Sequence, residues 1–85
     1  MATGNNGEKK MKTLYIINMT ERERIGLRIR EIMNDKNIST YKLAELTGIK
    51  QQNISRILLG KYSTGIDILS KIGDALNYRL DFVVK

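Results

Sequence analysis

The fold is decided by one stretch of the sequence, STYKLAELTGIKQQNISRILLGK, which covers residues 39–61. Ser39 suits the N-cap of a helix because its hydroxyl can accept a hydrogen bond from a free backbone N–H of the first turn. Ile38 lies just before this cap and Leu43 lies four positions after it, which is the spacing of a hydrophobic staple. The pattern predicts a short helix over about residues 40–47.

A second short helix follows after a tight turn. Gly48 ends the first helix, because a residue without a Cβ adopts the required left-handed conformation at little cost. The apolar period then resumes and predicts a helix over about residues 51–59, which Gly60 ends. Its core-facing residues are Ile54, Ile57 and Leu58. Two short helices joined by a turn at Gly48-Ile49-Lys50 form the arrangement that fits a helix into the major groove of DNA.

A longer helix is predicted before this pair. Thr20 and Glu23 have the spacing of a capping box, and the helix runs to about Lys36, where Asn37 suits the left-handed residue that closes it. Its apolar residues at helical spacing are Ile25, Ile29, Ile32 and Met33. A fourth helix is predicted over about residues 65–76, with Asn77 as its terminator. The predicted inner face of this helix consists of Ile66, Leu69, Ile72 and Leu76.

The two ends of the chain have a different pattern. Residues 1–12 are rich in Gly, Asn and Lys, so we expect a disordered basic tail. Residues 13–19 mix β-branched and aromatic residues and predict a short strand. In residues 78–85, apolar and charged side chains alternate, which predicts a second strand after a helical domain over residues 20–77. The strands pair either within one subunit or between two subunits.

Composition excludes several classes of function. The chain of 85 residues contains no cysteine and no histidine, so it lacks thiolate nucleophiles, imidazole bases and the usual zinc ligands. We expect neither an enzyme nor a bound metal or cofactor. No apolar run is long enough for a membrane span, and no signal peptide is apparent, so we expect a soluble, cytoplasmic protein that does not contact membranes.

The net charge of +6 is localised. The excess of lysine and arginine lies in residues 1–12 and in residues 39–62, which contain four basic residues and one acidic residue. A localised basic excess suits a polyanionic partner, and ordinary solubilising charge is the alternative interpretation.

Residues 25–76 resemble the helix-turn-helix of phage repressors and Cro proteins, the Xre-like regulators. The resemblance rests on Leu43-Ala44, Gly48, Ile49, Ile54 and Gly60-Lys61. It implies a mainly α fold, a four- to five-helix repressor-like DNA-binding domain, here with short N- and C-terminal β-strands. It also implies that double-stranded DNA is the partner.

Carried over by position, the resemblance makes Gln51, Gln52 and Arg56 the base-reading side chains. The helical period supports this choice independently, because these residues and Ser55 project away from the predicted core face. The alternative is a polar face that is merely solvated. The candidate contacts with the DNA backbone are Thr40, Lys50, Asn53, Lys61 and Tyr62.

The sequence departs from the family at several places, among them the cap of the recognition helix and the C-terminal end. Lys50 replaces the usual Ser or Thr cap, so the start of the recognition helix lacks a side-chain cap. The C-terminal strand is similar to that of HipB-type antitoxins, which dimerise through paired strands and also hold a toxin. We therefore expect a homodimer, because a core this small without disulfides gains stability from a partner subunit. The predicted dimerisation residues are Leu80, Phe82, Val84 and Ile16.

The sequence thus predicts a sequence-specific transcriptional regulator, a repressor that binds an inverted-repeat operator as a dimer. The alternative is an antitoxin that binds both DNA and a toxin protein. A protein-interaction module that does not bind DNA is a weaker hypothesis, against which the basic central segment and the Gln/Arg face argue.

Overall fold

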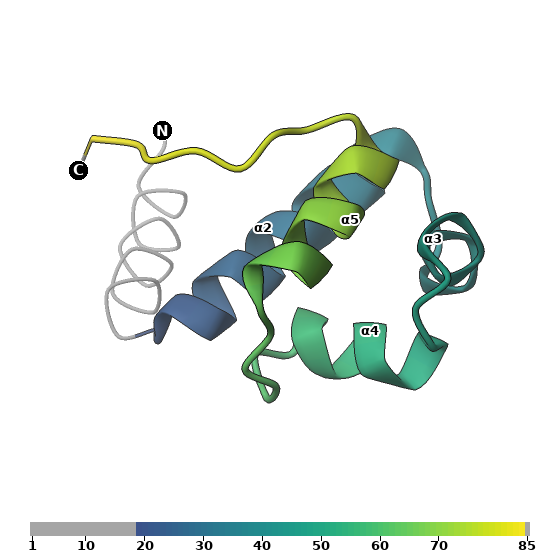
Figure 1. Cartoon of the computed structure of the whole chain (residues 1–85), viewed down its shortest axis with the longest axis horizontal. Helices are drawn as coiled ribbons and strands as arrows, with labels where there is room; N and C mark the ends of the chain where they lie inside the picture. The colour runs from purple at the N-terminus through teal and green to yellow at the C-terminus, as the bar shows by residue number, and fades with distance from the viewer. Residues whose placement is uncertain (1–18, 85) are drawn as a thin grey trace, which may run out of the picture.

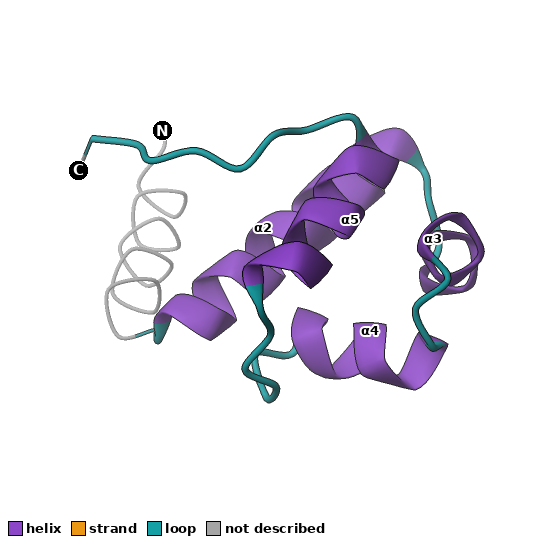
Figure 2. Ribbon diagram, viewed as in Figure 1, coloured by secondary structure: helices purple, strands orange, loops and turns teal. Residues whose placement is uncertain are grey.

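The structure is a computed structural model that describes residues 19–84. In this range it contains four α-helices and no strand: α2 (Glu21–Lys36), α3 (Thr40–Thr47), α4 (Gln51–Leu58) and α5 (Ile66–Leu76) (Figures 1 and 2). The mainly α fold is confirmed, and each predicted helix begins and ends within one residue of its observed bounds. The predicted tail, nearly all of the predicted N-terminal strand and Ile16 lie outside the described residues.

The helix ends follow from the local sequence. Thr20 Oγ1 accepts a hydrogen bond from the backbone N–H of Glu23 at 3.2 Å, and Glu23 Oε1 accepts one from the backbone N–H of Thr20 at 3.0 Å. This is the predicted capping box at the start of α2. Ser39 Oγ accepts from the backbone N–H of Lys42 at 3.0 Å and so caps α3. Asn37 and Asn77 end α2 and α5 in the left-handed conformation, as predicted.

The core lies where the four helices meet. Leu43 of α3 and Ile54 of α4 are 0% exposed, and Ile72 and Leu76 of α5 are almost completely buried. Residues from α2 complete this cluster. The helices α2 and α5 run beside each other (Figure 1). The helices α3 and α4 contact each other, and in addition α4 packs on α2 and α3 packs on α5. The arrangement buries one face of α4 and leaves the opposite face open.

One core prediction was wrong. Ile66 is 71% exposed, although the apolar period placed it on the inner face of α5. It is the first residue of the helix and lies beyond the edge of the core, whereas Ile68 and Leu69 are the residues that pack against the buried cluster. The period of a helix gives the direction of a side chain but does not show how far the core extends.

The predicted C-terminal strand is also absent from the part of the chain that the structure describes. Residues 78–84 are a loop segment that leaves the end of α5 and runs back along the molecule (Figure 2). A strand exists only when its backbone pairs with a second strand, and the described residues provide none. Phe82 and Val84 are fully exposed in this segment.

The chain reverses sharply between α5 and this segment. Tyr78 donates its backbone N–H to the carbonyl oxygen of Gly73 at 2.8 Å. A Cβ on Gly73 would lie 2.9 Å from the carbonyl oxygen of Tyr78, so the return path requires a glycine there. The ring of Tyr78 lies 5.8 Å from the ammonium nitrogen of Lys36, within the range of a cation–π contact. These contacts direct the C-terminal segment back over α2 and α5.

Candidate nucleic-acid interface

The turn between α3 and α4 sets the direction of α4. Gly48 has φ 77°, the left-handed conformation that its lack of a Cβ permits. Thr47 organises the turn from the preceding position, because its hydroxyl donates to the carbonyl oxygen of Leu43 at 2.8 Å and accepts from the N–H of Ile49 at 3.2 Å. Thr47 was not predicted as part of the turn, although a threonine directly before a helix-ending glycine was the available signal.

The start of α4 is bare, as predicted. Lys50 is the N-cap residue, with an extended backbone at φ −60° and ψ 138°, and its side chain makes no capping hydrogen bond. The first N–H groups of α4 are therefore open to water or to an anion. Ile54, which is completely buried, fixes this end of the helix on the core.

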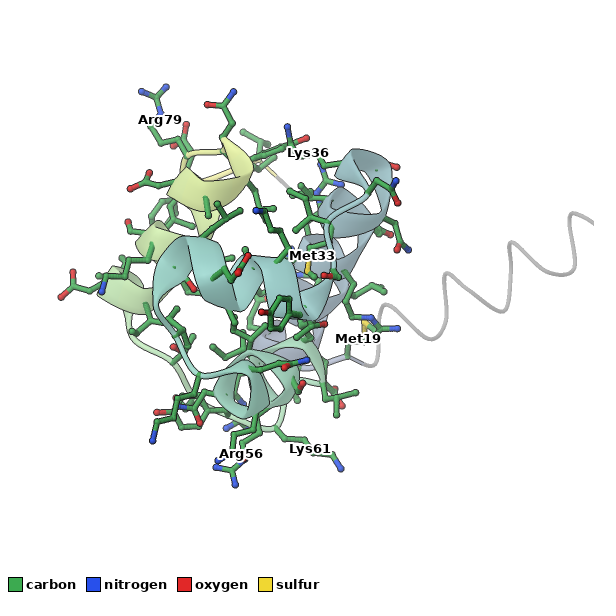
Figure 3. All side chains as sticks on the ribbon, turned by 90° about the vertical axis from the view of Figure 1, so that its right-hand side faces the viewer. Met19, Met33, Lys36, Arg56, Lys61 and Arg79 are labelled. Atoms are coloured by element: carbon green, nitrogen blue, oxygen red, sulfur yellow. The ribbon has the colours of Figure 1, made fainter. Side chains whose placement is uncertain are left out.

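Three candidate base-reading side chains lie on the open surface of α4. Gln51, Gln52 and Arg56 are exposed. Because Gln52 and Arg56 are four residues apart, they lie on the same face of the helix, one turn after the other. Figure 3 shows Arg56 and Lys61 pointing away from the body of the molecule on the same side, opposite to Lys36 and Arg79. Gln52 and Arg56 therefore share the outward face of α4, whereas Gln51 lies in its exposed first turn, one turn before Ser55.

Ser55 lies on the flank of α4. It lines a shallow groove of about 530 Å³ together with Thr40 at the start of α3, so two predicted contacts from different helices meet there. Arg30 of α2 lines the same groove and is exposed. Arg30 was not among the predicted contacts, because the helical pattern of α2 does not show that this flank faces α4.

The remaining backbone candidates differ in exposure. Lys50, Lys61 and Tyr62 are exposed at the two ends of α4, where they are free to reach a DNA backbone. Asn53 is half-buried and Thr40 is half-buried, so their reach is shorter.

Charge pairing leaves the cations of this face free. The ion pairs recorded in residues 19–84 are Glu21–Arg24 at 2.6 Å, Arg28–Glu31 at 3.4 Å and Lys42–Glu45 at 3.6 Å. Each joins residues three apart on the surface of α2 or α3. The Arg24 guanidinium donates hydrogen bonds to the Glu21 carboxylate, which raises the pKa of Arg24. Within the described range, none of these pairs includes Lys50, Arg56 or Lys61. The three cations are thus available to an external anion.

The far end of α4 is held close to α2. Gly60 ends α4 with φ 71°, and the N–H of Lys61 donates to the carbonyl oxygen of Arg56 at 3.0 Å. A Cβ on Gly60 would lie 2.6 Å from the Cα of Glu23, so the two backbones touch. The capping box of α2 therefore also supports the end of α4.

Two short helices, a glycine turn and a polar outward face on the second helix define a helix-turn-helix DNA-binding domain. The sequence model of the Cro/C1-type HTH DNA-binding domain family matches residues 28–81, and the chain belongs to this family. Neither a curated protein nor a solved structure matches the chain significantly. No helix within residues 19–84 combines the length and the apolar character that crossing a membrane requires.

Proposed function

We propose that the protein is a transcriptional repressor that binds an inverted-repeat operator as a homodimer and blocks polymerase by occupying its site. The observation that carries this proposal is the exposed surface of α4, where Gln52 and Arg56 lie on the outward face and Gln51 lies in the first turn, on a helix that the buried Ile54 packs onto the core. Such a face reads DNA without catalysis, so the proposal requires neither an enzyme activity nor a cofactor.

The side chains of α4 have the chemistry of major-groove readout. A glutamine amide pairs in a bidentate manner with adenine N6 and N7, and an arginine guanidinium pairs with guanine O6 and N7. Gln51 and Gln52 lie in the first turn of α4, which enters the groove first in proteins of this architecture, and Arg56 lies one turn later. Ser55 on the flank can reach a neighbouring base of either kind.

The backbone contacts position the helix. Lys50, Lys61 and Tyr62 flank α4, and Thr40 and Asn53 lie closer to the core. Contacts of this type go to phosphate oxygens and set the register of the protein on the duplex without reading sequence. They predict an affinity that falls as salt concentration rises, by about 0.9 logarithmic units per phosphate contact for each tenfold increase in salt.

The C-terminal segment supports the homodimer. Leu80, Phe82 and Val84 expose apolar surface that the small helical core leaves uncovered. A twofold dimer places two recognition helices about 34 Å apart, the spacing of successive major grooves. Truncation after Asn77 is expected to give a monomer with much weaker operator binding, as measured by analytical ultracentrifugation and by titration with DNA. A truncated chain that still sediments as a dimer would place the interface on the helices.

The same exposed segment favours a second candidate function, an antitoxin whose main partner is a toxin protein. In that case the apolar segment holds the toxin while α4 binds DNA. Gene context distinguishes the two functions at little effort, because an antitoxin gene lies beside a toxin gene. Co-expression with the neighbouring gene product, followed by purification of a stoichiometric complex, would establish the antitoxin.

The experiment that tests the proposed function is the selection of bound fragments from a random pool of DNA, followed by sequencing. We expect an inverted repeat. Arg56→Ala is expected to lose the preference at one base pair of each half-site, whereas Lys71→Ala, on the exposed side of α5, serves as the matched control and keeps the full site. A pool that stays random after selection would contradict the proposed function.

A further inference from the structure

An apolar groove lies on the side of the molecule formed by α2, α5 and the C-terminal segment. Its volume is about 360 Å³, and neither α3 nor α4 lines it. The floor consists of aliphatic side chains from α2 and α5, including Ile25, Ile29 and Leu69. Contact between these apolar side chains and water is unfavourable, so covering the groove with another apolar surface would lower the free energy.

The chain's own C-terminal segment forms one wall of the groove but does not fill it. Leu80 and Val83 line the groove. Phe82 and Val84 do not, and they are 101% and 97% exposed. The largest apolar side chain of the segment therefore points into solvent beside an open apolar groove of the same molecule.

We propose that this groove receives Phe82 and Val84 of a second copy of this chain, and that two copies exchange their C-terminal segments reciprocally. The inference rests on the homodimer of the proposed function and names the surface that makes it. In this arrangement, each chain supplies one groove and one apolar segment, so a twofold axis satisfies both copies at once.

The surface area buried between the two copies reaches that of a stable dimer only if both copies exchange their segments. An aromatic side chain buries about 150–250 Å², so Phe82 with the smaller Val84 offers on the order of 300 Å². One segment with an equal area of groove buries roughly 600 Å², which is no more than a typical crystal contact, whereas two buried segments bring the total to roughly 1,200 Å², the low end of a standard stable interface.

The location of the groove is compatible with DNA binding. Because the lining residues come from α2, α5 and the C-terminal segment, an occupied groove covers neither the outward face of α4 nor Lys61. In Figure 1 the C-terminal segment runs on the far side of α2 and α5 from α4. Dimerisation through the groove thus leaves both recognition helices available.

The absence of cysteine in the sequence allows a clean cross-linking test. One chain carries Phe82→Cys, and a second, enlarged by a tag, carries Leu69→Cys on the groove floor. After mixing and mild oxidation, we expect a disulfide between the two chains, seen as a mixed dimer on a non-reducing gel. Phe82→Cys alone and Leu69→Cys alone are the controls, and neither is expected to cross-link efficiently.

Three outcomes would overturn the inference. In a single chain that carries both Phe82→Cys and Leu69→Cys, a disulfide that forms only within that chain would mean that the segment fills its own groove. Efficient cross-linking of Phe82→Cys with itself would mean that two segments pair side by side. Absence of any cross-link in a protein that ultracentrifugation shows to be a monomer would leave the groove to a different protein. In each case, specific DNA binding by the unmodified protein is measured separately, so the proposed function stands or fails by itself.

A second measurement does not depend on cysteine chemistry. Phe82→Asp is expected to raise the dissociation constant of the dimer at least roughly 30-fold, as does truncation of a hot-spot residue in other interfaces. Since Phe82 is fully exposed, the fold of each subunit stays intact. Leu46→Asp makes a similar change on the exposed side of α3 and is the matched control, with an unchanged dissociation constant. Equal constants for the two variants would contradict the inference.

Discussion

Gly26 of α2 packs directly against the carbonyl oxygen of Leu58, the last residue of α4. A Cβ on Gly26 would lie 2.5 Å from this oxygen and 2.6 Å from that of Ile57, closer than real Cβ atoms approach. The backbone of α4 therefore packs directly on the backbone of α2. The position of α4 depends on the absence of a side chain at residue 26.

Gly26→Ala is expected to destabilise the fold and weaken DNA binding. Alanine favours a helix over glycine by up to about 1 kcal/mol, but forced overpacking costs about 1–3 kcal/mol. Because the clash is with main-chain atoms, α4 must move. Chemical denaturation and DNA titration measure the two effects.

Gly65→Ser is the matched control for this prediction. Gly65 is the N-cap of α5, it has extended backbone dihedrals, and no atom lies within 4 Å of an added Cβ. Serine there is expected to raise the free energy of unfolding by a few tenths of a kcal/mol, roughly the difference between Ser and Gly at an N-cap. Wild-type stability and DNA affinity in Gly26→Ala would show that α2 and α4 do not pack as described.

Arg56→Ala and Lys61→Ala are expected to weaken DNA binding in different ways. Loss of a bidentate contact with a base reduces discrimination at that base pair by about 1–3 kcal/mol, which is the result expected for Arg56→Ala. Lys61→Ala is expected to weaken binding to all sequences alike. Competition between specific and scrambled duplexes measures both. If Arg56→Ala keeps the wild-type ratio of the two affinities, Arg56 is not a base-reading residue.

Lys50→Ser is expected to change stability and DNA binding in opposite directions. Serine would cap α4 and raise the free energy of unfolding by about 1 kcal/mol, since the present cap makes no side-chain hydrogen bond. The lost charge would lower affinity for every sequence and reduce the salt slope by about one. Thermal unfolding and DNA titration at several salt concentrations measure both changes. A salt slope equal to that of the wild type would remove Lys50 from the phosphate contacts.

Thr64→Val is expected to stabilise the protein. The hydroxyl oxygen of Thr64, in the loop before α5, is buried and has no hydrogen-bond partner among the described residues. Valine has nearly the same shape, with a methyl group in place of the hydroxyl, so the buried polar group is removed without leaving a cavity. The free energy of unfolding should therefore rise by about 1 kcal/mol. Thr47→Val is the matched control, because the hydroxyl of Thr47 makes two hydrogen bonds and its loss should destabilise by a similar amount. If both variants change the free energy of unfolding in the same direction, the prediction is contradicted.

Local signals in the sequence were sufficient to predict the helices. Thr20 and Ser39 cap their helices with side-chain oxygens, and Asn37, Gly48 and Asn77 end helices in the left-handed conformation. Each of these features acts over three or four residues, so the order of residues along the chain contains the necessary information. The outward face of α4 could be predicted for the same reason, because the buried Ile54 fixes the helical period.

Features that depend on distant residues could not be predicted. The close contact at Gly26 and the groove that joins Arg30 to Ser55 arise only when α2 packs on α4. The C-terminal segment shows a different limit. Its alternation of apolar and charged residues indicates a tendency to form a strand, but a strand requires a second strand beside it, and the described part of one chain supplies none.

The side chains of Gln51, Gln52 and Arg56 support no other part of the fold: they are exposed, and none of them makes a side-chain hydrogen bond or ion pair that the described residues record. In the proposed function, folding and recognition are thus encoded at separate positions of the same eight-residue helix. We expect a change at any of these three positions to alter which DNA sequence is bound while leaving the free energy of unfolding nearly constant. Duplicated copies of such a gene can therefore diverge toward new operators by single substitutions, and a laboratory library randomised at these positions should consist largely of folded proteins.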